Sequence, residues 1–246
     1  MKRTRTALAA PALALASLMV LSACGDSDSS SSDSAAGKSE ESAKAPEKTA
    51  DPAAELRRAA LTANEVKGFA VKKPDAKYAF ATSQDQMKVD KPVCTPLAYA
   101  TNQLPLGAPK ADLVRLATGA KGPGDFTYVT LATYGSGEAK TTLAELSKSI
   151  RSCGAGFSAE AKGNKGGFSS IAAETAPEPS GADESLAFRV TTKIEGITHT
   201  MRAQVARHGD TIAIYYAVDG MAFTQDRPGN AKVGEAVVAA QSAKLA

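Results

Sequence analysis

The chain has few of the residues on which enzyme and metal sites usually depend. Among its 246 residues there are two histidines and three cysteines. It contains no HExxH, no GxSxG and no paired metal-ligand spacing, and its stretches YGSGEAK and GNKGGFSS do not match a phosphate-binding P-loop. These absences argue against a metalloenzyme, a nucleophile-elbow hydrolase and a nucleotide-binding protein. We therefore expect no catalytic residues, no metal and no cofactor.

An excess of positive charge is also missing from most of the chain. The sequence carries 29 basic and 26 acidic residues, and three of the basic residues lie within positions 1–5. Residues 24–246 are therefore formally neutral. No basic stripe with interleaved aromatic residues is present. We expect no binding to nucleic acid, because such binding depends on clustered positive charge.

Residues 1–23 have the plan of a bacterial export signal. Three basic residues precede an apolar stretch over 7–21. This stretch is shorter than the roughly 20 residues that a transmembrane helix needs, and Pro11 weakens it further as a helix. No second apolar stretch of spanning length follows. The pattern predicts a signal peptide and a protein that does not span the membrane.

The end of this segment, Leu-Ser-Ala-Cys at 21–24, resembles the lipobox of bacterial lipoproteins. In that family a peptidase cuts before the cysteine, whose thiol carries a diacylglycerol. The resemblance implies lipidation at Cys24, with the membrane as a partner through this lipid. The alternative is an ordinary export signal with a cysteine there by chance.

Residues 24–50 are predicted to be the lipid anchor and a polar tether. The stretch 25–50 has no aromatic residue and no Val, Leu, Ile or Met. Because it cannot bury enough apolar surface to offset its ordering entropy, we expect it to be disordered. Its random-coil reach is roughly 25–30 Å. Residues 51–246 then form a single domain on the extracytoplasmic face of the cell membrane.

Two cysteines remain in this domain after Cys24. Cys94 and Cys153 have the spacing of neither a redox CxxC pair nor a metal site. In an exported protein an even pair of cysteines predicts a disulfide, which here closes a loop of about 60 residues. The alternative is two buried free thiols.

Hydrophobic periodicity predicts a mixed arrangement of helices and strands. We expect helices over 52–62, 138–153 and 231–244 and a short helix ending at Tyr99. We expect strands over 68–71, 78–81, 113–117, 126–134, 185–194, 197–205 and 211–218. The predicted fold class is α+β, with an antiparallel β-sheet of about five to seven strands and helices packed mainly on one face.

One predicted hairpin places two positive charges opposite each other. A two-residue turn at 195–196 makes Val190 face Met201, which puts the apolar residues of both strands on one face. In the same register Arg189 faces Arg202. Like charges directly opposite are destabilising unless something neutralises them.

The pair Arg189 and Arg202 is therefore a candidate anion-binding site. Asp219, Glu174, a bound anion or solvent could neutralise it, and Asp219 on the next strand is the acidic residue expected nearby. The planar guanidinium suits a carboxylate or a phosphate. The alternative is a solvated outer face with splayed side chains.

The order of the elements resembles a known family. A first helix containing ELRRAALT, a CTPLA segment, a helix ending in cysteine, long hairpins and a terminal helix follow one another. This order is similar to actinobacterial secreted lipoproteins related to the extracellular sensor domains of mycobacterial serine/threonine kinases. The resemblance implies an antiparallel sheet with a cleft for an undefined ligand. The chain departs from the kinase sensor domains in having one pair of cysteines rather than two disulfides, and it has no kinase domain.

Together these observations predict a membrane-anchored extracytoplasmic lipoprotein. We expect a non-catalytic, sensor-like binding module for an envelope ligand or a protein partner. One alternative is a cell-envelope hydrolase, which requires a hydroxyl beside His199 or a carboxylate. Another is a lipid carrier, which requires a large apolar cavity. His199 alternates with Ile197 and Met201, which favours a histidine in the core, whereas His208 lies in a predicted turn.

Overall fold

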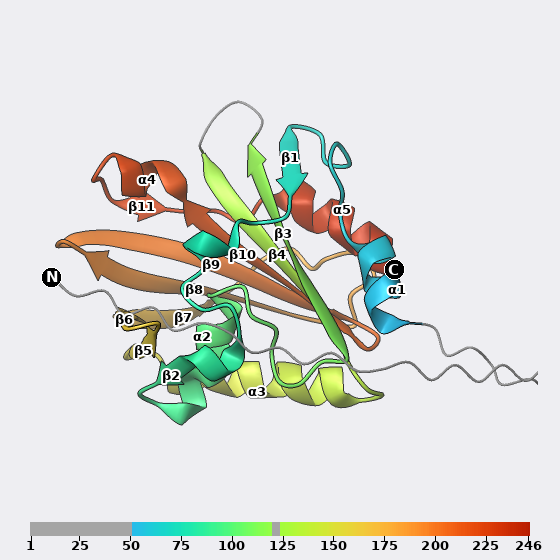
Figure 1. The fold of residues 1–246 in the computed structure, drawn as a ribbon, viewed down its shortest axis with the longest axis horizontal. Coiled ribbons are helices and arrows are strands. Elements are labelled where there is room, and N and C mark those ends of the chain that lie inside the picture. The colour runs from blue at the N-terminus through green and yellow to red at the C-terminus, as the bar shows by residue number, and fades with distance from the viewer. Residues whose placement is uncertain (1–50, 120–123) are drawn as a thin grey trace, which may run out of the picture. The chain divides into compact units, whose positions relative to one another are not determined.

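Figure 1 shows the fold in a computed structural model, which describes residues 51–119 and 124–246. Cys24, the predicted signal peptide and the predicted tether lie outside the described residues. The helices are α1 (Pro52–Ala59), α2 (Thr95–Ala100), α3 (Glu138–Ser152), α4 (Gly220–Thr224) and α5 (Glu235–Leu245), with short 3-10 turns η1 (Ala76–Tyr78), η2 (Gln84–Gln86) and η3 (Pro92–Cys94). The strands are β1 (Phe69–Lys72), β2 (Met87–Val89), β3 (Ala111–Gly119), β4 (Asp125–Thr133), β5 (Phe157–Ala161), β6 (Asn164–Phe168), β7 (Ser170–Glu174), β8 (Glu184–Ile194), β9 (Ile197–His208), β10 (Thr211–Asp219) and β11 (Gly229–Asn230).

Most strands belong to one large antiparallel sheet. Its order is β1-β3-β4-β10-β9-β8-β7, and the short β11 adds to β9 in parallel. A second sheet contains β2, β5 and β6. The predicted α+β class with a large antiparallel sheet is confirmed. No helix among the described residues is long and apolar enough to cross a membrane.

The predicted register of the β8–β9 hairpin is confirmed. Val190 pairs with Met201, and Arg189 pairs with Arg202. The turn residues, at 195–196, both have positive φ, +51° and +84°. A two-residue turn of this kind matches the twist of the strands that it joins. The hairpin therefore has one apolar face and one polar face.

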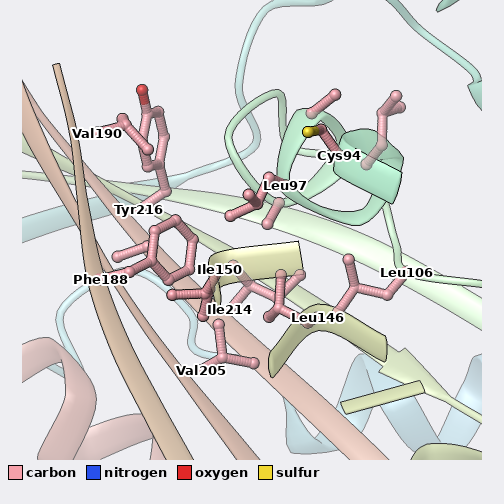
Figure 2. Close-up of a cluster of buried hydrophobic side chains, with 14 of the residues drawn as sticks. Cys94, Leu97, Leu106, Leu146, Ile150, Phe188, Val190, Val205, Ile214 and Tyr216 are labelled. Atoms are coloured by element: carbon pink, nitrogen blue, oxygen red, sulfur yellow. The ribbon is translucent and has the colours of Figure 1, made fainter. Parts of the chain in front are cut away.

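The helices cover both faces of the large sheet, although the sequence predicts packing mainly on one. The side chains of α2 and α3 join the first core, part of which Figure 2 shows, and those of α1 and α5 join the second. The reason lies in β10, which is apolar on both sides. Ile214 and Tyr216 belong to the first core, whereas Ala213 and Tyr215 belong to the second. Both faces of such a strand must be covered.

The alternation at 78–81 predicted a strand, but this segment is not a strand in the structure. It leaves η1 as an irregular segment, and Tyr78 at the end of η1 is 78% exposed. The alternating pattern is four residues long, which is too short to distinguish a strand from a loop. The strands β2, β5, β6 and β7 were not predicted at all.

Gln241 joins the first and last helices. Its fully buried side chain accepts a hydrogen bond from the Leu61 amide at 3.0 Å and donates one to the Ala59 carbonyl at 2.8 Å. Both groups lie where α1 ends and would otherwise have no helical partner. The bonds stabilise the end of α1 against α5.

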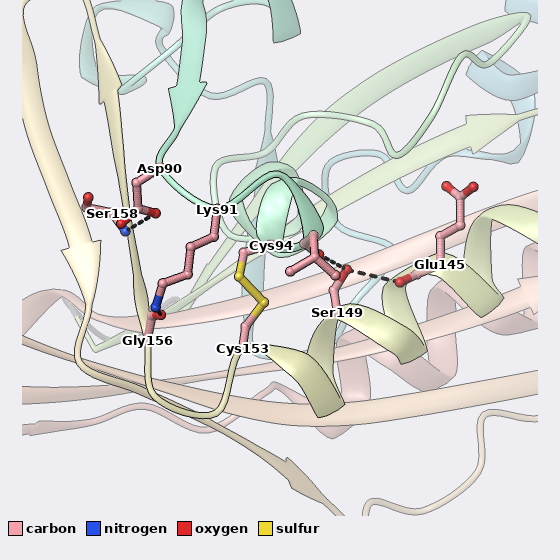
Figure 3. The surroundings of a disulfide bond; sticks show 9 residues. Asp90, Lys91, Cys94, Glu145, Ser149, Cys153, Gly156 and Ser158 are labelled. Atoms are coloured by element: carbon pink, nitrogen blue, oxygen red, sulfur yellow. Dashed lines mark hydrogen bonds between the residues drawn. A yellow bond between two sulfur atoms is a disulfide. The ribbon is translucent and has the colours of Figure 1, made fainter.

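Cys94 and Cys153 form the predicted disulfide (Figure 3), and their Cα atoms are 5.9 Å apart. Cys94 is the last residue of η3, and Cys153 directly follows α3. Both side chains are buried. The disulfide therefore holds the end of α3 against the segment that enters α2.

Hydrogen bonds extend this junction into the small sheet. Lys91 donates to the Gly156 carbonyl at 2.6 Å, and an Asp90 carboxylate oxygen accepts from the Ser158 amide at 2.9 Å (Figure 3). On the other side of the disulfide, Ser149 of α3 donates to the Val93 carbonyl at 2.6 Å. The base of the β2–β5 pair is thus tied to α3.

Replacing both cysteines, as Cys94→Ala/Cys153→Ala, should lower the free energy of unfolding by roughly 4 kcal/mol on the chain-entropy estimate for a loop of this length. Urea denaturation of the oxidised protein and the double variant measures the difference. Intact-mass analysis after alkylation, under denaturing and non-reducing conditions, is the control. Two readily alkylated thiols in the parent protein would refute the disulfide.

Candidate functional site

Arg189 and Arg202 face each other as predicted, and a carboxylate of the same chain bridges them. Glu174, the last residue of β7, accepts from Arg189 at 3.1 Å and from Arg202 at 2.9 Å through different oxygens. Arg202 also donates to the Asn230 side chain at 2.6 Å and to the Ala231 carbonyl at 2.8 Å. The Glu174 carboxylate therefore offsets the repulsion between the two guanidinium groups, and no bound anion is needed to explain why they lie side by side.

Asp219, which the sequence placed near this pair, has a different role. It pairs with Arg227 at 3.3 Å and accepts a hydrogen bond from the Ala222 amide at the start of α4. Glu174, the other acidic residue considered from the sequence, bridges the pair instead, because β7 pairs with β8. An anion-binding role for Arg189 and Arg202 stays a prediction.

The bridge predicts a non-additive effect on stability. Glu174→Gln should lower the free energy of unfolding by about 1 kcal/mol, since it leaves two like charges facing each other at a partly exposed site. Adding Arg189→Gln should recover most of that loss, because the repulsion is then removed. A double-mutant cycle by urea denaturation measures the coupling. An equal effect of Arg189→Gln with and without Glu174 would contradict the bridge.

His199 lies in the core, as its alternation favours. Its ring stacks on that of Phe223, with centroids 4.2 Å apart and planes 6° apart. Its Nδ1 atom is buried and has no hydrogen-bond partner among the described residues. His199 is therefore a support for Phe223, and its Nδ1 activates no neighbouring hydroxyl.

His208, which was predicted to lie in the turn, is the last residue of β9. Its Nδ1 lies 3.1 Å from the Gly181 carbonyl, and its buried Nε2 has no partner among the described residues. Burial lowers the pKa of its imidazole, although the Gly181 carbonyl and the nearby Asp183 act in the opposite direction. The contact of its Nδ1 is therefore with the backbone.

A cleft of about 760 Å³ opens between the small sheet and the end of the β8–β9 hairpin. This volume is within the usual range for small-molecule sites. Most of its large side chains are aromatic, and we refer to it as the aromatic cleft. Its aromatic residues are Phe80, Phe157, Phe168, Tyr216 and Phe223.

Two large apolar side chains at the aromatic cleft are open to solvent. Ile194, at the end of β8, is 45% exposed, and Phe223 of α4 is 36% exposed. They are two of the four large hydrophobic residues that are exposed in the described part of the chain, the others being Tyr78 and Val93. Exposed apolar residues that line one hollow mark it as a binding surface more clearly than scattered ones do.

The wall of the aromatic cleft is held at a defined distance by β6. A Cβ atom at Gly167 would lie 2.7 Å from the Phe157 carbonyl oxygen, so only glycine fits there. The Gly167 carbonyl accepts a hydrogen bond from the Thr192 hydroxyl of β8 at 2.7 Å. On the cleft wall, Phe157 packs edge-to-face on Phe168 with centroids 5.4 Å apart. These contacts fix the small sheet against the large one.

The aromatic cleft has a largely apolar floor, and two of its buried lining residues, Tyr216 and Thr101, carry hydroxyls. Tyr216 is 5% exposed, and its hydroxyl donates to the Met201 sulfur at 3.1 Å. Burial raises the pKa of the Tyr216 phenol well above its ordinary value, so it stays protonated. These buried residues therefore offer a neutral surface whose two hydroxyls both donate hydrogen bonds within the protein.

A second hollow, of about 620 Å³, lies between α1, the η1 region and the first half of β3. Its lining is more highly charged and includes Arg57, Lys73, Asp112 and Arg115. Arg115 already donates a hydrogen bond to the Leu61 carbonyl at 3.1 Å. Burial raises the pKa of the Asp112 carboxyl. We favour the aromatic cleft as the candidate site, because two of its apolar side chains, those of Ile194 and Phe223, are exposed to solvent.

None of the lining residues of the aromatic cleft was identified from sequence. Its five aromatic residues come from five different segments of the chain. Two of them, Phe157 and Phe168, lie on strands that hydrophobic periodicity did not predict. The one available signal was the glycine-rich stretch GNKGGFSS, which contains β6. This stretch was compared only with a phosphate-binding P-loop, which it does not match.

Comparison with solved structures finds similar chains, including an extracellular domain of a mycobacterial kinase. The extracellular domain of PknH from Mycobacterium tuberculosis is similar with 11% identity and a TM-score of 0.43, over 73% of this chain and 83% of that chain. An uncharacterised protein from Mycobacterium smegmatis, the Rv0999 ortholog, is similar with 15% identity and a TM-score of 0.37, over 79% and 95%. No family model matches the chain, and no curated protein matches it by sequence.

Proposed function

We propose that the protein is a non-catalytic, extracytoplasmic binding module that takes the apolar part of an envelope ligand into the aromatic cleft. The observation that carries the proposal is the position of Ile194 and Phe223, which remain exposed at the mouth of a hollow with aromatic walls. Leaving such side chains in water costs free energy that a bound apolar group would recover.

The contacts of the two histidines favour binding over hydrolysis. A hydrolase requires a hydroxyl or a carboxylate beside the catalytic base. His199 stacks on Phe223, and the Nδ1 of His208 faces a backbone carbonyl. A lipid carrier requires an enclosed apolar cavity, whereas the aromatic cleft is open to solvent.

The proposed module is held on the outer face of the cell membrane by the lipid on Cys24. The lipobox resemblance supports this anchor, and the Cys94–Cys153 disulfide fits an oxidising compartment outside the cytoplasm. An anchored binding module of this kind samples ligands within reach of its tether.

Cys24→Ala should move the protein from the membrane fraction to the soluble extracytoplasmic fraction, because the thiol that carries the acyl groups is lost. Fractionation of cells followed by immunoblotting measures the distribution. Ser27→Ala, three residues away, leaves the lipobox intact and should stay with the membrane. Membrane association of the Cys24→Ala protein would show that the anchor lies elsewhere.

The aromatic cleft should bind the neutral apolar dye Nile red, whose fluorescence rises in an apolar environment. In the full chain carrying Cys24→Ala, the further change Phe223→Ala should weaken dye binding about fivefold, because one apolar wall is removed. Tyr78→Ala removes an exposed aromatic ring outside the cleft and should leave the affinity unchanged.

Phe223→Ala also removes the stacking partner of His199, so its fold needs a check. Ile194→Thr keeps a β-branched residue in β8 and changes only an exposed side chain, and it should weaken dye binding in a fully folded protein. Circular dichroism and the urea midpoint establish folding for each variant. Unchanged dye affinity in both cleft variants would exclude the aromatic cleft as the site.

A further inference from the structure

The charged residues that line the aromatic cleft are all of one sign. Among its lining residues, Lys165 of β6 and Lys193 of β8 carry charge, and none is acidic. Both lysines are exposed, and neither forms an ion pair with another described residue. Glu160 lies opposite Lys165 in the register of the small sheet but makes no ion pair with it. The aromatic cleft thus has two uncommitted positive charges.

The strand alternation places these charges at the mouth and not over the floor. Thr192 and Ile194 share the core-facing side of β8, so Lys193 between them belongs to the opposite side. Lys165 likewise alternates with Gly166, where an added Cβ atom would lie 3.6 Å from the Phe80 ring. A lysine side chain is long enough to bring its ammonium group around the end of a strand while its stem covers apolar surface. The ammonium groups therefore remain in water at the two edges.

Depth and charge together define the chemistry of a matching ligand. An apolar group can enter between the aromatic walls, where no charged partner is available and an ionised group would be desolvated without compensation. A negative group can stay at the mouth, within reach of both lysines. From this separation we infer that the ligand is an anionic amphiphile, which inserts an alkyl chain into the aromatic cleft and leaves a carboxylate or phosphate between Lys165 and Lys193.

This inference rests on the proposed function, since it requires the aromatic cleft to be the binding site. It adds the charge of the ligand and its orientation. A cation or a neutral alkyl compound can fill the same apolar walls but gains nothing at the mouth. The sign of the head group therefore tests the inference separately from the site.

The test uses the full chain with Cys24→Ala, which has no acyl groups of its own at that position. Isothermal titration calorimetry compares decanoate, decanol and decyltrimethylammonium, each below the concentration at which it forms micelles. Decanoate should bind about tenfold more tightly than decanol, and decyltrimethylammonium most weakly, because two exposed charges contribute modestly. Added salt should reduce the advantage of decanoate, because it screens exposed charges.

Lys165→Gln/Lys193→Gln should abolish the preference for decanoate and leave decanol binding unchanged. The matched control is Lys140→Gln/Lys148→Gln, which makes the same change in net charge at exposed positions of α3 and should keep the preference. Exposed lysines without ion pairs contribute little to stability, so all these variants should fold.

The outcomes separate this inference from the proposed function. Equal binding of decanoate and decanol, or a preference that survives in Lys165→Gln/Lys193→Gln, overturns the anionic head group while the aromatic cleft remains the site. Binding of neither decanoate, decanol nor Nile red overturns the proposed function as well. Binding of anionic phosphatidylglycerol vesicles but not of free decanoate also overturns the inference, because the lysines then recognise a bilayer surface.

Discussion

The Cys94–Cys153 disulfide determines where the small sheet stands relative to the large one. The strand β2 ends a few residues before Cys94, and β5 begins a few residues after Cys153, so the bond closes the base of the β2–β5 pair. The same bond attaches η3 to α3, which packs on the large sheet through Leu146 and Ile150. The aromatic cleft lies between the two sheets, so its width depends on this covalent link.

The aromatic cleft combines rigid walls with exposed apolar side chains. Gly167 allows β6 to approach β5 closely. The Thr192 hydroxyl of β8 donates a hydrogen bond to the Gly167 carbonyl, which connects β6 to the large sheet. The His199 ring stacks on Phe223, and its buried Nδ1 has no hydrogen-bond partner within residues 51–119 and 124–246, a cost that the fold must offset elsewhere. A site that is already formed before a ligand arrives loses less entropy on binding. These features are consistent with the binding of a ligand and do not require a catalysed reaction.

The Arg189–Arg202 pair shows both the strength and the limit of pattern reasoning. The turn at 195–196 and the apolar alternation were sufficient to predict which residues face each other, because a hairpin is a local structure. Glu174 was one of several groups that could neutralise the pair, and the sequence could not single it out, because Glu174 belongs to a strand whose sequence, SIAAE, has weak alternation. Similarly, Phe157 and Phe168 face one cleft only because β5 and β6 pair with each other and then pack on β8.

The sequence by itself determined the α+β class, the β8–β9 register, the disulfide pairing and the long helix α3, because each follows from local periodicity, a short turn or the count of cysteines. Tertiary structure alone decided that helices cover both faces, that Gln241 joins α1 to α5, and that five aromatic residues from distant segments meet in one cleft. These features depend on contacts between residues far apart in the chain. Such contacts arise from the packing of complete elements, and no periodicity within one element encodes them.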